Sequence, residues 1–392
     1  MRAEDTLPPG DAFARAAATL TEESLRLRGG KKWEDAVDGM LPAWVAESDF
    51  AVAPVVRAAL TDVVDRGEFG YVSDERLAAF RGAVSRWYGE AHATPVPEEH
   101  VHPVGDVIEA YRHAIRDFTA PGTPIIVPLP AYPPFSAVAA EEGRDVLHIG
   151  AVGGLDLDAL DATMREHRAL LVLCNPHNPL GRVAPREELL AIAEIVDRSG
   201  GRVFADEIHA PLVLDDVSHV PYASVSPAAA AHSLTAFAAS KAFNLPSLKA
   251  AALLTSNAAD LGRWNKLGPL AGHGAGIMGL VAGTAALDHG REWLTQQNAY
   301  LRSNRDLVGR AASGIPGAAF TLSQATYLQW IDLTAVDRTS PIRTAAHMCA
   351  EAGLLVNDGS TFGGFPGHIR LNFATPRHLL VEMLDRLTRA FA

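Results

Sequence analysis

Three polar residues closely follow apolar runs of the sequence, and their types could perform covalent chemistry. Asn178 comes after ALLVLCNP, Asp206 ends the run VFAD, and Lys241 follows SLTAFAAS. A lysine amine in an apolar pocket can have a lowered pKa and then attack an aldehyde carbon. A buried carboxylate such as Asp206 is costly unless a cation or a hydrogen-bond donor faces it. Together the three residues indicate a covalent lysine site with an electron sink.

Lysine is rare in this chain. The stretch FAASKAFNLPSLKAA holds Lys241 and Lys249, and the only other lysines are Lys31, Lys32 and Lys266. Apart from these five lysines and the histidines, every basic residue of the chain is an arginine. Two lysines eight positions apart, in an otherwise small, apolar or hydroxylic stretch, therefore call for a chemical explanation.

Short apolar runs alternate with helical patterns between about residues 100 and 256. The runs predict buried strands at 123–130, 169–176, 201–207, 233–240 and 250–257. DLDALDATMREH and REELLAIAEIVDRSG have helical spacing, and GDVIEAYRHAIRDF predicts a helix after a glycine turn. This alternation predicts an α/β fold with a mostly parallel sheet and helices on both faces. In such sheets ligands bind beyond the carboxyl ends of strands, where the three polar residues fall.

The pattern changes after about residue 290, which indicates a second, smaller α+β domain. Its expected elements are a long helix (291–313), a strand (325–333), a helix near 341–353, a strand (368–374) and a final helix. We expect the N-terminal segment to join this domain. The predicted division is 1–52 as part of the small domain, 53–289 as the large domain, and 290–392 as the C-terminal small domain.

Composition excludes several classes of function. The chain has 392 residues and a formal net charge of −12, with no basic run, so nucleic acid and anionic membranes are not expected partners. No apolar run is long enough to span a bilayer. Two cysteines cannot form a disulfide framework, which fits a reducing cytoplasm. His102, His177 and His273 lack metal-ligand spacing, so no metal is expected.

Several motifs, in order along the chain, resemble those of fold-type I pyridoxal-phosphate (PLP) enzymes of the aminotransferase class I/II superfamily. They are FGY (69–71), AYPPF (131–135), CNPHNPLGR (174–182), DEIHA (206–210), SKAFNLP (240–246), TYLQWIDL (326–333) and RLNFA (370–374). The closer resemblance is to MalY/PatB-type cystathionine β-lyases, or C–S lyases. It extends from LPAWVAESDF to HIRLNFATPR and implies pyridoxal 5′-phosphate as cofactor and a PLP-transferase type I large domain.

The resemblance implies roles for the polar residues. Lys241 matches the Schiff-base lysine, and Asp206 matches the partner of the pyridine nitrogen, which keeps that nitrogen protonated. Asn178 would hydrogen-bond the phenolic oxygen of the cofactor. Arg370 would bind the α-carboxylate of the substrate through a bidentate pair. Ala46, Glu47 and Asn178 complete the expected substrate site.

The remaining cofactor contacts are implied in the same way. Tyr132 would stack on one face of the ring, Ile208 would cover the other, and His209 takes a place where many relatives have tyrosine. The expected phosphate contacts are Gly105, Asp106 and Val107, at a helix N-terminus, and Lys249. Ser240 is expected to be a further cofactor-binding residue. Tyr71 would reach the phosphate of the neighbouring subunit, which implies a homodimer.

Four positions depart from the family pattern. Ala238 stands where many relatives have a phosphate-binding serine. Asp106 places a carboxylate near the expected phosphate, so it must point away or be offset by Lys249. Glu47 and Ser48 replace a usual Asp-Met pair near the expected substrate entrance, which puts the substrate class in question more than the cofactor.

The expected function is β-elimination of cysteine S-conjugates or cystathionine to thiol, pyruvate and ammonia. Three alternatives remain open: an aminotransferase, a specialised enzyme acting on a bulky cysteine S-conjugate by elimination, decarboxylation or oxidative deamination, and a PLP-binding regulatory protein. Retention of both Lys241 and Arg370 argues against a purely regulatory role.

Overall fold

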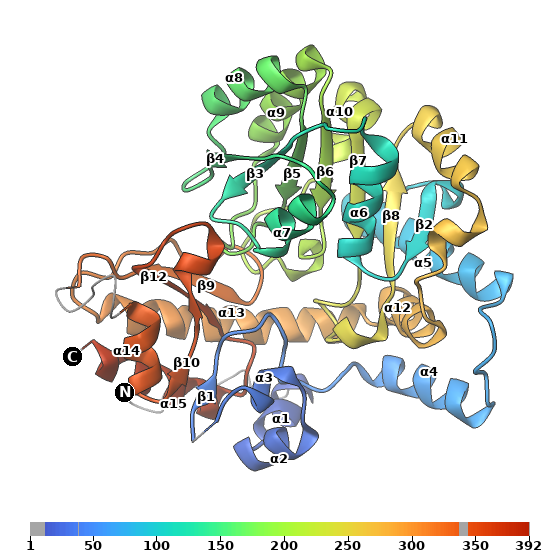
Figure 1. The fold of residues 1–392 in the computed structure, drawn as a ribbon. Coiled ribbons are helices and arrows are strands. Elements are labelled where there is room, and N and C mark those ends of the chain that lie inside the picture. Colours follow the sequence, from blue (N-terminus) through green and yellow to red (C-terminus); the bar gives the residue numbers. More distant parts are fainter. Residues whose placement is uncertain (1–11, 38, 337–343, 392) are drawn as a thin grey trace.

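The computed structural model describes residues 12–37, 39–336 and 344–391, and its elements form two groups (Figure 1). One group surrounds a seven-stranded sheet. The other contains two small sheets and the long helix α13, which passes below the large sheet in Figure 1.

The large sheet has the strand order β2-β8-β7-β6-β5-β3-β4. Its strands are β2 (Val101–Val104), β3 (Ile125–Leu129), β4 (Val146–Gly150), β5 (Leu170–Cys174), β6 (Arg202–Asp206), β7 (Ser233–Phe237) and β8 (Ala251–Thr255). β8 is antiparallel to both neighbours, and the other pairs are parallel. The predicted α/β fold with a mostly parallel sheet is therefore confirmed.

Helices cover both faces of this sheet because its strands are apolar on both sides. On β5, Leu170 and Val172 face a core that includes residues of α6 and α7, whereas Leu171 and Leu173 face a core built with α8 and α9. This alternation is the two-residue period of a strand. The helices of this group are α4 (Pro54–Asp65), α5 (Asp74–His92), α6 (Val107–Phe118), α7 (Pro134–Glu141), α8 (Leu157–His167), α9 (Arg186–Ser199), α10 (Pro227–His232), α11 (Ala258–Leu267) and α12 (Ile277–His289).

The second group joins the two ends of the described chain. Its helices are α1 (Ala12–Ala18), α2 (Glu22–Arg28), α3 (Lys31–Glu34), α13 (Arg291–Ser313), α14 (Ala345–Glu351) and α15 (Arg377–Ala390). Its strands are β1 (Leu41–Pro42), β9 (Leu328–Asp332), β10 (Leu354–Leu355), β11 (Asn357–Asp358) and β12 (His368–Asn372). β1 pairs in parallel with β10, and α1 contacts α13 and α15. The domain boundaries at 52 and 289 stay a prediction.

Most predicted elements are present, with shifted ends. The helix predicted at 105–118 begins at Val107, because Asp106 is its N-cap and accepts a hydrogen bond from the Glu109 N–H at 2.8 Å. The strand predicted at 325–333 is present as β9, but it is shorter and runs only from Leu328 to Asp332. The helix predicted near 341–353 is present as α14, and residues 341–343 lie outside the described part of the chain.

The order of the strands explains how distant polar residues meet. β5, β6 and β7 are adjacent and parallel. Asp206 is the last residue of β6, Asn178 follows β5, and Lys241 follows β7. Their side chains therefore leave the same edge of the sheet, at its carboxyl ends.

Candidate active site

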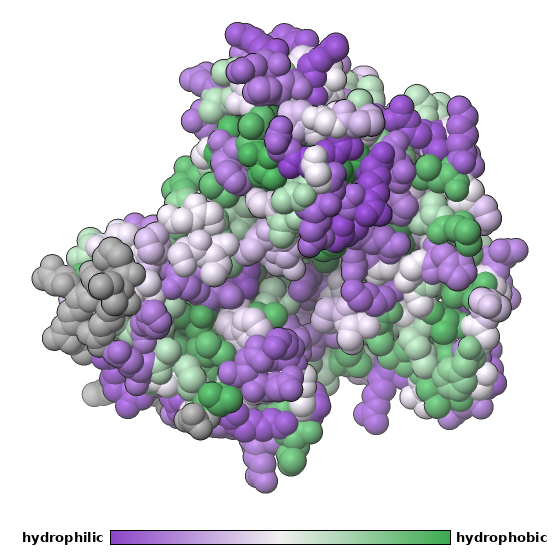
Figure 2. Space-filling view, in the orientation of Figure 1, coloured by the Kyte–Doolittle hydropathy of each residue, from purple (hydrophilic) through white to green (hydrophobic). Residues whose placement is uncertain are grey.

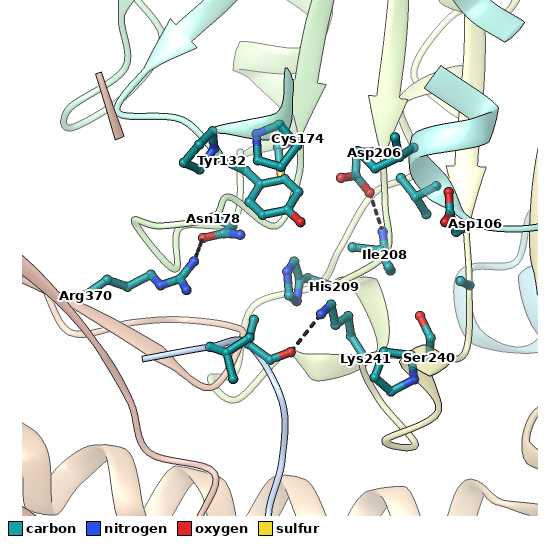
Figure 3. Close-up of a pocket in the computed structure, with 18 of the residues that line it drawn as sticks. Asp106, Tyr132, Cys174, Asn178, Asp206, Ile208, His209, Ser240, Lys241 and Arg370 are labelled. Carbon is teal, nitrogen blue, oxygen red and sulfur yellow. Dashed lines mark hydrogen bonds between the residues drawn. The ribbon is translucent and has the colours of Figure 1, made fainter. Parts of the chain in front are cut away.

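A cavity of about 400 Å³ opens at this edge of the sheet (Figure 3). All the predicted site residues except Tyr71 and Glu47 line it. Those residues are Ala46, Gly105, Asp106, Val107, Tyr132, Asn178, Asp206, Ile208, His209, Ser240, Lys241, Lys249 and Arg370. They come from both groups of elements, so the cavity needs the N- and C-terminal segments as well as the sheet.

Lys241 projects into the cavity from the turn after β7 (Figure 3). Its Nζ donates a hydrogen bond to the Ala46 carbonyl at 2.7 Å. Burial, followed by the charge of Arg370, lowers the pKa of Lys241 to about 8. A sizeable share of the amine is therefore neutral near pH 8, as a nucleophile or a general base requires.

Asp206 is a buried carboxylate with a single hydrogen bond described, accepted by Oδ1 from the Ile208 N–H at 3.1 Å. Among the described residues it has no ion-pair partner. Burial raises its pKa to about 7. A carboxylate left in this condition fits a cationic ligand group, such as a protonated pyridine nitrogen, that would supply the missing partner.

Arg370, on β12, brings a buried guanidinium to the opposite side of the cavity. It donates to the Asn178 side-chain oxygen at 2.9 Å, to the Trp44 carbonyl at 2.8 Å and to the Asn357 side-chain oxygen at 2.6 Å. Its Nε is buried without a partner. These bonds use three of the five N–H groups of the guanidinium, and the two that remain, on Nε and Nη1, can bind a carboxylate.

The N-terminus of α6 forms another wall, where the resemblance places a phosphate. Lys249 pairs with Asp106 there, with Nζ 2.6 Å from Oδ2. The Asp106 carboxylate is thus both the helix cap and the partner of Lys249, so Lys249 offsets its charge. Gly105 donates its N–H to the Glu109 carboxylate at 2.5 Å. Free N–H groups of the first helical turn, with Lys249, could hold an anion.

Tyr132, Ile208 and His209 line the middle of the cavity. Tyr132 packs edge-on against Phe135, with 5.6 Å between ring centroids. Burial lowers the pKa of His209 to about 3, so its imidazole is neutral, and its Nδ1 is buried without a hydrogen-bond partner. An orphaned polar atom beside Lys241 again fits a site that a polar ligand completes.

Two predicted residues lie elsewhere. The side chain of Tyr71 is 94% exposed and does not line this cavity, so its expected reach to a neighbouring subunit stays a prediction. Glu47 also lies outside the lining, and the structure places its carboxylate near Gly30. Its charge still acts on Lys241, whose pKa it raises against the larger lowering by burial.

Sequence reasoning missed several residues that shape the site. Tyr327 donates its hydroxyl to the Ala46 carbonyl at 3.0 Å, and Asn357 holds Arg370. Trp44 and Phe362 form apolar walls. Tyr327 and Trp44 stand inside motifs that were recognised, so membership in those motifs was the available signal.

The arrangement defines a class of site. A lysine with a lowered pKa, a buried carboxylate lacking a cation and a buried arginine meet in one cavity beside a helix N-terminus. Such a site could hold an anionic pyridine aldehyde and an amino acid together.

Comparison with known proteins identifies the family. The aminotransferase class I and II family model matches residues 45–387. A cystathionine β-lyase of Corynebacterium glutamicum is 36% identical over 93% of this chain and 97% of its own length. Cystathionine β-lyase PatB of Bacillus subtilis is 30% identical over 91% of this chain and 94% of its own. The chain belongs to the aminotransferase class I and II family.

A solved structure supports the same grouping. The crystal structure of a PLP-dependent β-cystathionase from Corynebacterium diphtheriae has a TM-score of 0.91 with this chain, at 39% identity. The match covers 95% of this chain and 98% of that one. The predicted resemblance to the cystathionine β-lyases is confirmed.

Within the described residues, no group of three or more His, Cys, Asp or Glu side chains is arranged to hold a metal ion. No helix in that part of the chain is long and apolar enough to cross a membrane.

Proposed function

We propose that this chain is a pyridoxal-phosphate-dependent carbon–sulfur lyase. It would eliminate the thiol from cysteine S-conjugates or cystathionine and yield pyruvate and ammonia. The observation that carries the proposal is the meeting of Lys241, Asp206 and Arg370 in one cavity. The similarity to cystathionine β-lyases along almost the whole chain favours elimination over amino transfer.

The residues of the chain divide the work of cofactor binding. Lys241 would hold the aldehyde carbon, Asp206 the pyridine nitrogen and Asn178 the phenolic oxygen. Tyr132 and Ile208 would enclose the ring, while the N-terminus of α6, Ser240 and Lys249 would hold the phosphate. When bound, pyridoxal phosphate supplies an electron sink that makes the Cα–H of an amino acid acidic.

Arg370 and Lys241 would control the bond that breaks. Arg370 binds the α-carboxylate and so fixes the orientation of Cα, with Asn178 and Asn357 holding the guanidinium in place. The Lys241 amine takes the Cα proton as general base. The Cβ–S bond then breaks, and its electron pair leaves on sulfur, which is protonated to the thiol. The remaining aminoacrylate is released and hydrolysed by water to pyruvate and ammonia.

We also propose that the working enzyme is a homodimer in which Tyr71 of one subunit reaches the phosphate of the other. The 94% exposure of Tyr71 supports this, as does the exposure of Phe69 (65%) and Val64 (52%) nearby. Figure 2 shows apolar surface in the region of α4, from which this loop continues. Exposed apolar surface of this kind is typical of an interface.

Product analysis tests the proposed function. The purified protein, loaded with pyridoxal phosphate, is mixed with L-cystathionine, with S-alkyl-L-cysteines, and with L-alanine plus a keto acid. Pyruvate, thiol and new amino acid are measured separately. Equal amounts of pyruvate and thiol without any keto acid are expected. Amino transfer without thiol release would overturn the proposal in favour of an aminotransferase, and full cofactor binding without turnover of any substrate would favour a regulatory protein.

A further inference from the structure

Every charged residue that lines the described cavity is either paired with another residue or assigned to the cofactor or the α-carboxylate. Asp106 and Lys249 pair with each other at 2.6 Å. Lys241 and Asp206 face the expected cofactor, and Arg370 faces the expected α-carboxylate. Within the described lining, no charged side chain is left over for a second charged group of the substrate.

Most of the remaining wall is apolar, and its polar members, which include Ser240, Asn357 and Thr361, are neutral. Its apolar members include Trp44, Val45, Ile108, Pro133, Pro134 and Phe362. Phe362 is 2% exposed and its ring lies 4.9 Å from the guanidinium carbon of Arg370, so this apolar wall begins beside the carboxylate-binding end. Phe362 in turn packs edge-on against Trp330, with 5.3 Å between centroids, which fixes its position.

The charged residues of the lining are assigned to the cofactor and the α-carboxylate, so the remaining wall determines which substituents on sulfur can bind. Once the α-carboxylate is on Arg370, the sulfur substituent must extend along the remaining wall or toward the opening. Within the described lining, a charged group that leaves water there meets no opposite charge that is not already paired or assigned, and it loses hydration. An apolar group gains in proportion to the apolar area it removes from water.

We propose that the preferred substrates carry a neutral, apolar substituent on sulfur, and not a second amino-acid group as cystathionine does. The inference rests on the proposed lyase function and narrows its substrate class. The walls that set the preference are Trp44 and Phe362, with Thr361 at the exposed rim.

A matched series of substrates tests this preference. S-propyl-L-cysteine and S-(2-aminoethyl)-L-cysteine have substituents of equal heavy-atom count and differ by one positive charge. S-carbamoylmethyl- and S-carboxymethyl-L-cysteine form the corresponding pair for a negative charge. We expect kcat/KM of the neutral member to be at least about tenfold higher in both pairs, and S-propyl-L-cysteine to exceed L-cystathionine. The aminoethyl thiol is the stronger acid, so leaving-group chemistry alone would favour the charged member of the first pair.

The outcomes separate the two proposals. If a charged member or cystathionine is used as well as its neutral counterpart, the inference is wrong and the lyase function stands. If no member of the series yields thiol and pyruvate, the proposed function itself fails.

Charge placed at the rim gives a second, independent readout. Thr361 is exposed, and its hydroxyl donates to the Asp358 carbonyl at 2.7 Å. Relative to Thr361→Gln, we expect Thr361→Glu to raise the aminoethyl-to-propyl ratio of kcat/KM several-fold. Thr361→Lys should raise the carboxymethyl-to-carbamoylmethyl ratio instead. Ratios unchanged in both variants would mean that the substituent does not extend along this wall.

Discussion

At the scale of single residues, burial moves the two central groups toward their neutral forms. It lowers the pKa of Lys241 to about 8 and raises the pKa of Asp206 to about 7. The attraction between the two residues opposes both shifts but is smaller than the effect of burial. The ionised carboxylate of Asp206 is therefore unfavourable in the empty site, and a cationic ligand group bound beside it would stabilise it.

The protein without cofactor should show this cost as a pH-dependent stability. A carboxyl whose pKa is higher in the folded state binds its proton more tightly there, so its stabilising contribution is lost as pH rises from about 4 to about 7. Asp206→Asn removes the titration. We expect the free energy of unfolding of the wild type, relative to this variant, to fall by roughly 2 kcal/mol between pH 5 and pH 8.

Urea unfolding of the cofactor-free proteins at both pH values measures this difference. A difference that stays constant with pH would contradict the burial of an unpaired carboxylate. Asp260→Asn is a matched control, because Asp260 is also buried but pairs with Arg202.

The residues named from sequence were those whose types stand out against an apolar run. Lys241, Asp206 and Arg370 were identified this way and by motif. The sequence does not single out Tyr327 and Asn357, because their roles depend on contacts with residues elsewhere in the chain: Tyr327 donates to the Ala46 carbonyl, and Asn357 accepts from Arg370. The motif TYLQWIDL indicates the family but assigns no role to Tyr327.

At the scale of elements, the segment 44–50 connects the two groups of elements at the site. Its Trp44 carbonyl accepts from Arg370 and its Ala46 carbonyl accepts from Lys241. A buried ion pair holds the segment 44–50 in place. Lys32 Nζ lies 2.8 Å from Asp49 Oδ2, and the two side chains are 1% and 2% exposed. Trp33 donates its indole N–H to Asp49 as well, at 2.7 Å.

Breaking this pair should destabilise the protein and loosen the segment. Lys32→Met leaves a buried carboxylate without its cation, which costs about 3 kcal/mol of unfolding free energy. The Lys32→Met/Asp49→Leu double variant should recover part of that loss. Urea unfolding measures both, and a single variant as stable as the wild type would contradict the buried pair.

The start of α6 allows a second test at this scale. Asp106→Asn keeps an oxygen that can cap the helix through the Glu109 N–H, while it removes the charge that neutralises Lys249. We expect the variant to bind pyridoxal phosphate roughly threefold more tightly, since an exposed pair of this kind is worth under about 1 kcal/mol. Fluorescence titration measures the Kd, and Lys249→Met should weaken binding. Weaker binding by Asp106→Asn would mean that Asp106 holds Lys249 in place for the phosphate.

Strands were predictable where both faces are buried and not at the sheet edges. β5 is buried throughout, and its run LLVLC is continuous. β4, VLHIG, lies at an edge and has one buried residue, and β2 contains His102 and Pro103, so neither shows a clear apolar run. β2 is nevertheless fully buried, because α5, α6 and β8 pack around it.

At the scale of the whole molecule, the described chain brings its ends together. β1 pairs with β10, and the walls of one cavity come from residues as far apart as Trp44 and Arg370. The sequence predicts that the N-terminal segment joins the small domain, but local patterns do not predict the particular pairing of β1 with β10. In the proposed dimer, the site would also include a residue of a second chain, because Tyr71 would complete the site of the neighbouring subunit.

Co-expression of two variants tests this sharing of sites. Lys241→Ala removes the reactive amine, and Tyr71→Ala removes the proposed phosphate contact. A hybrid dimer has one site with both defects and one site with neither, so random pairing should give about a quarter of wild-type activity at limiting pyridoxal phosphate. Activity no higher than the mean of the two parent homodimers would contradict a contribution of Tyr71 to the neighbouring site.

The central claim is that Lys241, in the cavity between the two groups of elements, carries the cofactor and the chemistry. Borohydride reduction of the protein loaded with pyridoxal phosphate, followed by peptide mass mapping, tests it most directly. The chain has only Lys31, Lys32, Lys249 and Lys266 as alternative lysines, so the assignment is unambiguous. We predict the added mass on Lys241, and Lys241→Ala should abolish it. Stoichiometric label on another lysine, with Lys241 unmodified, would contradict the account.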